Sequence, residues 1–146
     1  MLKRKTPLRA KNPIARSPAA RRMKKINSEK SARDCRWRSP QYLAWVRTQP
    51  CVVCGATTGI AAHHMIGMYN LGGMGLKAPD SYAMPACDPA AGSFNDCHQQ
   101  IHRIKALRAQ QPAFLRTTLR AGLNHFTGAD AEQLTHALAF LEAKEQ

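Results

Sequence analysis

The sequence predicts an α+β domain organised by bound metal, preceded by a disordered basic arm and followed by helices. Two observations carry this prediction. Residues 51–102 contain four of the five cysteines and four of the six histidines. Residues 1–50 contain 15 of the 22 lysines and arginines but only two acidic residues. We therefore divide the chain into an arm (1–33), a metal-binding domain (34–110) and a C-terminal helical extension (111–146).

The arm cannot form a packed domain. Pro7, Pro13 and Pro18 interrupt any helix in its first twenty residues, and no acidic residue precedes Glu29. We expect it to stay disordered until phosphates neutralise it, because nucleic acid is the commonest partner of such a basic block. The alternative is a solvated tail that only keeps the protein soluble. The side chains expected to contact nucleic acid are Lys3, Arg4, Lys5, Arg9, Lys11, Arg16, Arg21, Arg22, Lys24 and Lys25.

The elements of the domain follow from its capping residues and apolar spacing. Ser39 as N-cap and Pro40 at the first helical position predict a helix over residues 40 to about 48. Short apolar runs predict strands at 60–65 and 81–86, separated by a glycine-rich loop. Asp96 is expected to cap a helix that runs from Cys97 to about residue 110. Two further helices are expected, at about 112–123 and 129–143.

The cysteines predict a structural zinc site. Cys51 and Cys54 have the CxxC spacing of a zinc knuckle, and Cys87 and Cys97 are the remaining pair. Nine residues separate the second pair where a knuckle normally has two, so the intervening segment must loop out and return Cys97 to the metal. Paired cysteines in a chain without a secretory hydrophobic segment also indicate a reducing compartment.

The histidines predict a second metal site with a free imidazole beside it. His63 and His64 are adjacent on a predicted strand, so their side chains point to opposite faces. One can bind a metal while the other acts as a base. His98 and His102 are four residues apart on a predicted helix and share a face, so both can reach one ion. Cys97, one residue before His98, faces another direction around that helix.

This pattern resembles the HNH endonucleases, whose ββα-metal, treble-clef-like fold is often braced by a four-cysteine zinc. Segments 63–67 and 72–80 are similar to small phage and prophage HNH proteins, including a group associated with recombination. The resemblance covers residues 50–103. It implies that His64 is the general base and that His63 and His98, with His102 as third ligand, hold Mg²⁺, Mn²⁺ or another divalent ion.

The central Asn of the HNH motif has no clean match in this sequence. Asp80 has the nearest polar carbonyl and could accept the Nδ1 proton of His64, fixing its tautomer. The alternative role for Asp80 is that of a turn residue after Pro79. Asn70 and Asn95 are the fallback candidates.

Together these patterns predict a metal-dependent DNA endonuclease of low sequence specificity, acting in phage or prophage recombination or DNA processing. A recombinase or related recombination protein is a possible partner. The alternative is a non-catalytic, zinc-stabilised nucleic-acid-binding module, and a zinc-only interaction protein explains still less of the pattern. No run of 18 apolar residues is present, so we expect no membrane span and a location in the cytoplasm of a bacterial host cell.

Overall fold

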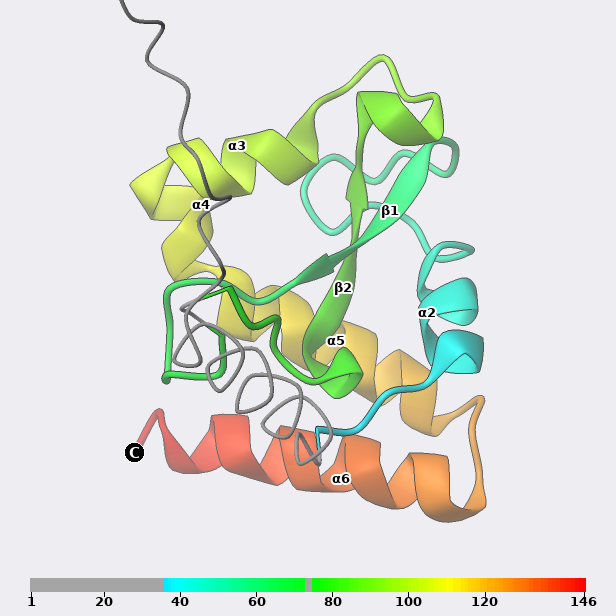
Figure 1. Cartoon of the computed structure of the whole chain (residues 1–146), viewed down its shortest axis with the longest axis vertical. Coiled ribbons are helices and arrows are strands. Elements are labelled where there is room, and N and C mark those ends of the chain that lie inside the picture. The colour runs from blue at the N-terminus through cyan, green and yellow to red at the C-terminus, as the bar shows by residue number, and fades with distance from the viewer. Residues whose placement is uncertain (1–35, 73–74) are drawn as a thin grey trace, which may run out of the picture. The chain divides into compact units, whose positions relative to one another are not determined.

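The computed structural model describes residues 36–72 and 75–146. The predicted arm, with every basic side chain expected to contact nucleic acid, lies outside the described residues. Arg36–Gln146 forms one compact unit, in which five α-helices surround a two-stranded sheet (Figure 1). The α+β class is therefore confirmed. None of the helices described is long and apolar enough to cross a membrane.

The sheet pairs β1 (Ile60–His64) with β2 (Ala83–Cys87) in antiparallel register. Ile60 lies opposite Cys87 and His64 lies opposite Ala83. The second strand begins two residues later than predicted, because Asp80–Tyr82 forms a short 3-10 helix, η1. All five residues of β2 are buried, so this strand is covered on both faces.

The first described helix, α2 (Pro40–Val46), has the predicted start. The Ser39 hydroxyl accepts a hydrogen bond from the Tyr42 backbone N–H at 3.2 Å, and Pro40 occupies the first turn. Tyr42 and Val46 are fully buried and join the core. The apolar face of this helix is thus part of the core packing.

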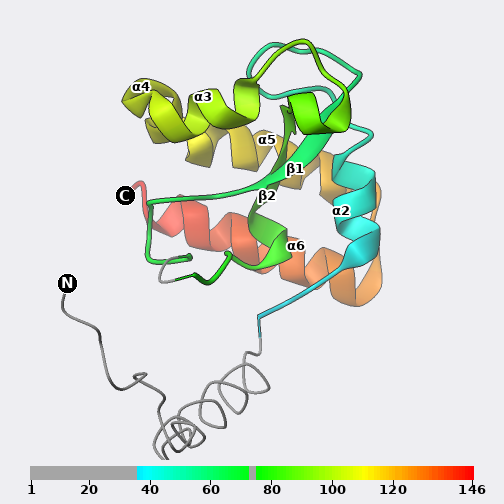
Figure 2. The same ribbon diagram turned by 45° about the horizontal axis from the view of Figure 1, so that its top comes forward.

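The predicted continuous helix from Cys97 to residue 110 is wrong. Its first part, α3 (Cys97–Arg103), is capped by Asp96 as expected, but the chain turns at Ile104 and resumes as α4 (Lys105–Ala109). Ile104 has extended dihedrals (φ −93°, ψ 110°), which end the helical hydrogen-bond ladder at that residue. The turn lets the chain leave the direction of α3 before α5 begins (Figure 2).

The C-terminal helices, α5 (Gln111–Leu123) and α6 (Gly128–Ala143), form an antiparallel pair beneath the sheet (Figures 1 and 2). Leu115 and Leu119 of α5 and Leu134 and Leu141 of α6 are fully buried in one hydrophobic cluster. Met84 of β2 belongs to the same cluster. The predicted C-terminal extension therefore packs on the same core as the metal-binding segment.

Candidate metal centres and catalytic site

Four cysteines meet at one end of the sheet. The sulfurs of Cys51, Cys54, Cys87 and Cys97 all lie within 4.8 Å of one another, and none is in a disulfide. Four thiolates at about 2.3 Å from a tetrahedral zinc are about 3.8 Å apart, and the Cys54 and Cys87 sulfurs are 3.4 Å apart. The cluster therefore has the size and donor set of a zinc site. The predicted grouping of these four cysteines is therefore confirmed.

Local structure fixes each sulfur in place. Gly55 (φ +76°) makes the tight turn after Cys54, and its N–H donates to the Cys51 carbonyl at 2.9 Å. The Cys87 N–H donates to the Cys51 sulfur at 3.4 Å, and Asn95 Nδ2 donates to the Cys54 sulfur at 3.6 Å. Asn95, a fallback candidate for the HNH asparagine, thus belongs to the cysteine cluster.

Thiol acidity in the cluster is uneven. A backbone hydrogen bond from Ala56 is the main cause that lowers the pKa of Cys54 to about 7. Burial raises the pKa of Cys87 to about 11, and burial also raises the pKa of Cys97. Burial therefore opposes ionisation of Cys87 and Cys97, and a bound cation would favour their thiolate forms.

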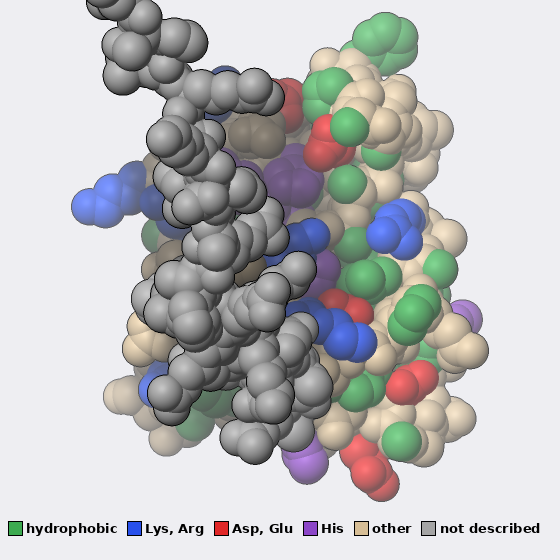
Figure 3. All heavy atoms as spheres, viewed as in Figure 1, with side chains coloured by type: hydrophobic (Ala, Val, Ile, Leu, Met, Phe, Trp, Pro, Cys, Tyr) green, Lys and Arg blue, Asp and Glu red, His purple; other side chains and the backbone are tan. Residues whose placement is uncertain are grey.

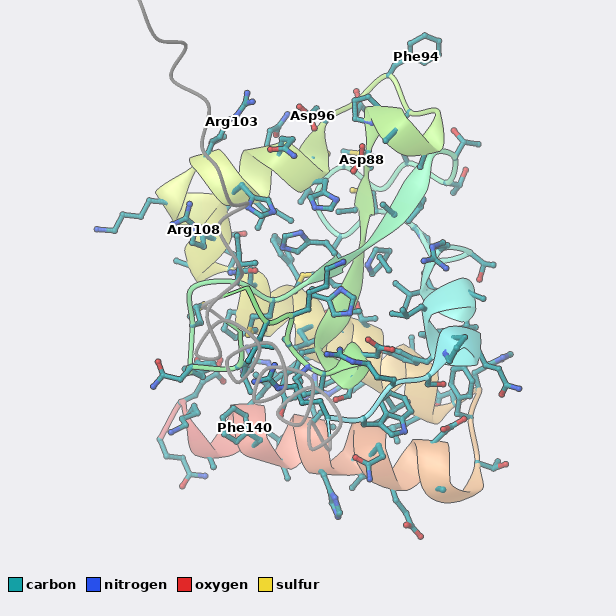
Figure 4. The ribbon with its side chains drawn as sticks, viewed as in Figure 1. Asp88, Phe94, Asp96, Arg103, Arg108 and Phe140 are labelled. Carbon is teal, nitrogen blue, oxygen red and sulfur yellow. The ribbon has the colours of Figure 1, made fainter. Side chains whose placement is uncertain are left out.

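The nine residues between Cys87 and Cys97 form a compact loop. Its short 3-10 helix, η2 (Pro89–Ala91), is capped by Asp88, whose side chain accepts from the Ala90 N–H at 2.8 Å. The Asp88 N–H donates to the Gly59 carbonyl at 3.0 Å. The loop therefore returns Cys97 to the other sulfurs, as the sequence requires. Figure 4 shows Asp88 and Asp96 at its two ends and Phe94 projecting from it.

Three histidines form a second cluster beside the first. His63 on β1 faces His98 and His102 on α3, with ring centroids 4.7 and 5.2 Å away. One ring nitrogen from each of the three lies within 4.8 Å of the others, which suits a divalent ion. His98 Nδ1 also lies 3.0 Å from a carboxylate oxygen of Asp88, outside hydrogen-bond geometry. The three predicted ligands are thus together.

His63 is the buried member of this cluster, and one of its ring nitrogens is unpartnered in the part of the chain that the structure describes. His63 is 1% exposed, and its Nδ1 has no hydrogen-bond partner within the described residues. Burial, with help from the neighbouring His98, lowers the pKa of His63 to about 4. The same two causes, joined by Arg108, lower the pKa of His102. A neutral imidazole with an unpartnered buried nitrogen has a lone pair that can bind a metal ion.

The two centres share their supporting elements. Cys87 and Asp88 are consecutive at the end of β2, and Cys97 and His98 are consecutive at the start of α3. In each pair the cysteine faces the sulfur cluster and its neighbour faces the histidine cluster. The predicted separation of Cys97 and His98 around the helix is confirmed.

His64 lies on the opposite side of β1 from His63, as predicted, and contacts Asp80. Its Nε2 is 2.9 Å from Asp80 Oδ1. The contact was expected through Nδ1, and that detail is wrong. Within residues 36–72 and 75–146 no hydrogen bond to His64 Nδ1 is found. Nδ1 is therefore the nitrogen available to accept a proton, provided that Nε2 carries the hydrogen.

Asp80 is held by several donors. It is 4% exposed. Besides His64, it accepts from the Ser39 backbone N–H at 2.9 Å and from Arg38 Nη1 at 3.1 Å. Burial acts to raise the pKa of Asp80, but these hydrogen bonds outweigh it and lower the pKa below its ordinary value. Asp80 also begins η1, so it serves the local turn and the contact with His64 together.

The histidine cluster and His64 line one cavity of about 410 Å³. Its walls include His63, His64, His98 and His102, together with Lys77. In the space-filling view, histidine side chains lie among lysine and arginine side chains on this face (Figure 3). Asn70, the other fallback candidate, is not among the cavity residues. The cavity therefore places a potential base, a potential metal and a positive charge in one space.

Two residues of the site, Gln111 and Arg108, were not predicted from the sequence. Gln111, at the start of α5, contacts His63 through its side-chain amide. Arg108 on α4 donates from Nη2 to the His102 carbonyl and is labelled in Figure 4. Neither residue belongs to a recognisable motif. The turn at Ile104 brings both of them to the site, so no local sequence pattern predicts their position.

Comparison with known proteins places the chain in a family of unknown function. Residues 27–124 match the family model described as "Protein of unknown function (DUF968)". The chain belongs to this DUF968 family. A segment of 52 residues is 46% identical to the uncharacterized protein YdfU of Escherichia coli (strain K12). That match covers 36% of this chain and only 14% of YdfU, so the chain accounts for a small part of its relative. No solved structure matches the chain.

Proposed function

We propose that this DUF968 chain is a metal-dependent DNA endonuclease in which β1, β2 and α3 form a ββα-metal unit of the HNH kind. One observation carries the proposal. His64, with Nε2 engaged by Asp80, opens onto the same cavity as three histidines arranged to hold a cation. Binding alone does not need a base beside a metal, whereas phosphodiester hydrolysis does.

Each residue then has a distinct role. His63, His98 and His102 would hold a divalent ion such as Mg²⁺ or Mn²⁺. Such an ion supplies stabilisation of negative charge on the phosphate and on the departing 3′ oxygen. His64 Nδ1 accepts a proton from the attacking water, and Asp80 keeps the hydrogen on Nε2 so that Nδ1 has a free lone pair. The expected products are a 5′-phosphate and a 3′-hydroxyl.

The cysteine cluster, with zinc bound, would keep the two ends of the catalytic unit together. It ties the end of β2, which is followed by Asp88, to the start of α3, which carries His98. Structural zinc sites of this type contribute directly to folding free energy. We therefore assign zinc a structural role and leave hydrolysis to the histidine site.

DNA is the proposed substrate because of the charge distribution of the chain. Residues 1–50 carry most of the lysines and arginines, and Lys77 lies in the cavity wall. Contacts to phosphates position DNA without reading its sequence, so low sequence specificity is expected. Action in phage or prophage recombination, beside a recombinase in a bacterial cytoplasm, belongs to the same proposal.

The second candidate is a zinc-stabilised nucleic-acid-binding module. It is favoured by the completeness of the cysteine cluster, which needs nothing from the histidines to bind zinc. This candidate predicts DNA binding without cleavage. It leaves the buried, unpartnered Nδ1 of His63 unexplained.

Nicking of supercoiled plasmid separates the candidates. The zinc-loaded protein is assayed with Mg²⁺, with Mn²⁺ and without either ion, beside His64→Ala. The matched control is His125→Ala, since His125 stacks on Trp45 away from the cavity. We expect metal-dependent nicking that His64→Ala loses and His125→Ala keeps. Tight DNA binding with no nicking by the parent protein would favour the binding module.

A further inference from the structure

We infer that Gln111 is a positioning residue that fixes the tautomer of His63 and thereby aims Nδ1 of His63 at the metal. This inference rests on the histidine metal site of the proposed function and not on DNA cleavage. Gln111 is the first residue of α5 and is fully buried. A buried amide must have its hydrogen-bonding groups satisfied, so its partners define its orientation.

The backbone fixes which way the amide points. Gln111 Oε1 accepts from the Ile66 N–H at 3.0 Å. Gln111 Nε2 donates to the Ile66 carbonyl at 2.9 Å and to the Arg108 carbonyl at 3.0 Å. Rotating the amide by 180° would set its NH₂ against an N–H and its oxygen against two carbonyls. Only one orientation therefore satisfies the three backbone groups.

The tautomer of His63 follows from that orientation. His63 Nε2 lies 3.2 Å from Gln111 Oε1. Because Oε1 can only accept, Nε2 must carry the hydrogen, and the lone pair of the neutral ring must sit on Nδ1. Nδ1 is the buried atom of His63 that has no partner among the described residues. His63 is thus set to bind a cation through Nδ1.

The Gln111 amide also fixes the backbone of Ile66, a residue that lines the cavity. Ile66, which makes two hydrogen bonds with Gln111, lines the cavity two residues beyond His64. One side chain therefore ties the metal ligand, the segment after β1 and the end of α4 to the start of α5. Partners of this kind that orient a metal-bound histidine contribute about 10- to 100-fold to metal affinity.

The test uses two substitutions at Gln111 in the full zinc-loaded chain. Gln111→Met removes every hydrogen bond at similar volume. Gln111→Glu keeps an acceptor for His63 Nε2 and loses the donors to the carbonyls. The matched control is Thr118→Val, which removes another buried polar group from α5, one that donates to the Phe114 carbonyl at 3.1 Å. The readouts are ¹⁵N NMR of the His63 ring before a second metal is added and Mn²⁺ affinity by titration.

We expect the parent protein to show hydrogen on His63 Nε2. Gln111→Met should weaken Mn²⁺ binding by about 10- to 100-fold, Gln111→Glu should keep the hydrogen on His63 Nε2, and Thr118→Val should keep the affinity within about threefold of the parent. Hydrogen on Nδ1 in the parent, unchanged Mn²⁺ affinity in Gln111→Met, or an equal loss in Thr118→Val would overturn the inference. Failure of the nuclease proposal would leave these results intact, because none of them measures cleavage.

Discussion

The substitution Asp80→Asn offers a sharp test of His64 as the proposed base, because it replaces one carboxylate oxygen with an NH₂ group and changes the volume little. Asp80 Oδ2 accepts from the Ser39 backbone N–H, and Oδ1 accepts from His64 Nε2 and Arg38 Nη1. An asparagine has only one oxygen for these two positions. The Ser39 N–H is buried and fixed, whereas the Arg38 side chain is 43% exposed and can move away. The oxygen should therefore face Ser39 and the NH₂ should face His64.

That orientation reverses the tautomer of His64. An NH₂ group donates, so His64 Nε2 must accept and the ring hydrogen moves to Nδ1. The nitrogen proposed to accept the proton from water is then blocked. General base catalysis contributes about 100- to 10,000-fold, so Asp80→Asn should slow cleavage by that factor. This corresponds to about 3–5 kcal/mol of activation free energy.

The expected loss of stability is smaller. Hydrogen bonds to a charged group contribute about 1.5–3 kcal/mol each, but Asn keeps the Ser39 bond and the exposed Arg38 pair contributes little. Arg38 Nη1 also keeps the Ala78 carbonyl at 2.7 Å as a partner. We expect the free energy of unfolding to fall by about 2 kcal/mol. DNA binding should be unchanged.

The assay is single-turnover cleavage at saturating DNA and metal, with thermal melting measured in parallel. Asp96→Asn is the control, because asparagine caps a helix as well as aspartate and Asp96 does not touch His64. The double variant Asp80→Asn/His64→Ala should be no slower than His64→Ala, because both changes remove one function. Cleavage by Asp80→Asn within about threefold of the parent protein, or an additive loss in the double variant, would refute the reasoning.

Asp80 also predicts a pH dependence of stability. Its pKa is lowered from 3.8 in the folded protein, so its stabilising effect is complete above the pKa of the unfolded chain. The effect is lost as pH falls through the lower pKa of the folded state. The difference in melting temperature between the parent and Asp80→Asn should therefore shrink as pH falls from about 5 to 2. A difference that does not change over this range would contradict the assignment.

Three further predictions concern zinc, the loop and the arm. Cys97→Ser should release zinc and lower the melting temperature; metal analysis showing one retained zinc and an unchanged melt would contradict the cysteine site. Gly59→Ala should weaken zinc retention more than Gly55→Ala. Both glycines have positive φ, but only at Gly59 would a Cβ lie 2.3 Å from the Ser93 backbone nitrogen. Equal effects of the two substitutions in a chelator competition would count against this. Deleting residues 1–33 should weaken DNA binding and flatten its dependence on salt, and an unchanged slope would show that the arm makes no phosphate contacts.

The parts of the site that depend on local spacing were predictable from the sequence. The CxxC pair, the adjacent histidines on a strand and the i,i+4 histidines on a helix each restrict where their side chains point. Asp96 as a cap correctly placed the start of α3 at Cys97. These relations needed only the period of a helix or strand.

The parts that depend on tertiary packing were not predictable. Ile104 is not a helix-breaking residue, yet its extended backbone separates α3 from α4. That turn brings Gln111 to His63, 48 residues away along the chain. The choice of Nε2 on His64 likewise depends on where η1 places Asp80 relative to β1. Long-range contacts of this kind leave no periodic signal.

We propose that a divalent ion binds among the three histidines, beside His64 as the base and apart from a structural zinc. Anomalous diffraction from crystals of the zinc-loaded protein soaked in Mn²⁺ tests it directly. We predict a zinc peak among the sulfurs of Cys51, Cys54, Cys87 and Cys97, and a separate manganese peak within bonding distance of His63 Nδ1 and of both α3 histidines. A manganese peak elsewhere, or no manganese with the cavity open to solvent, would contradict the account.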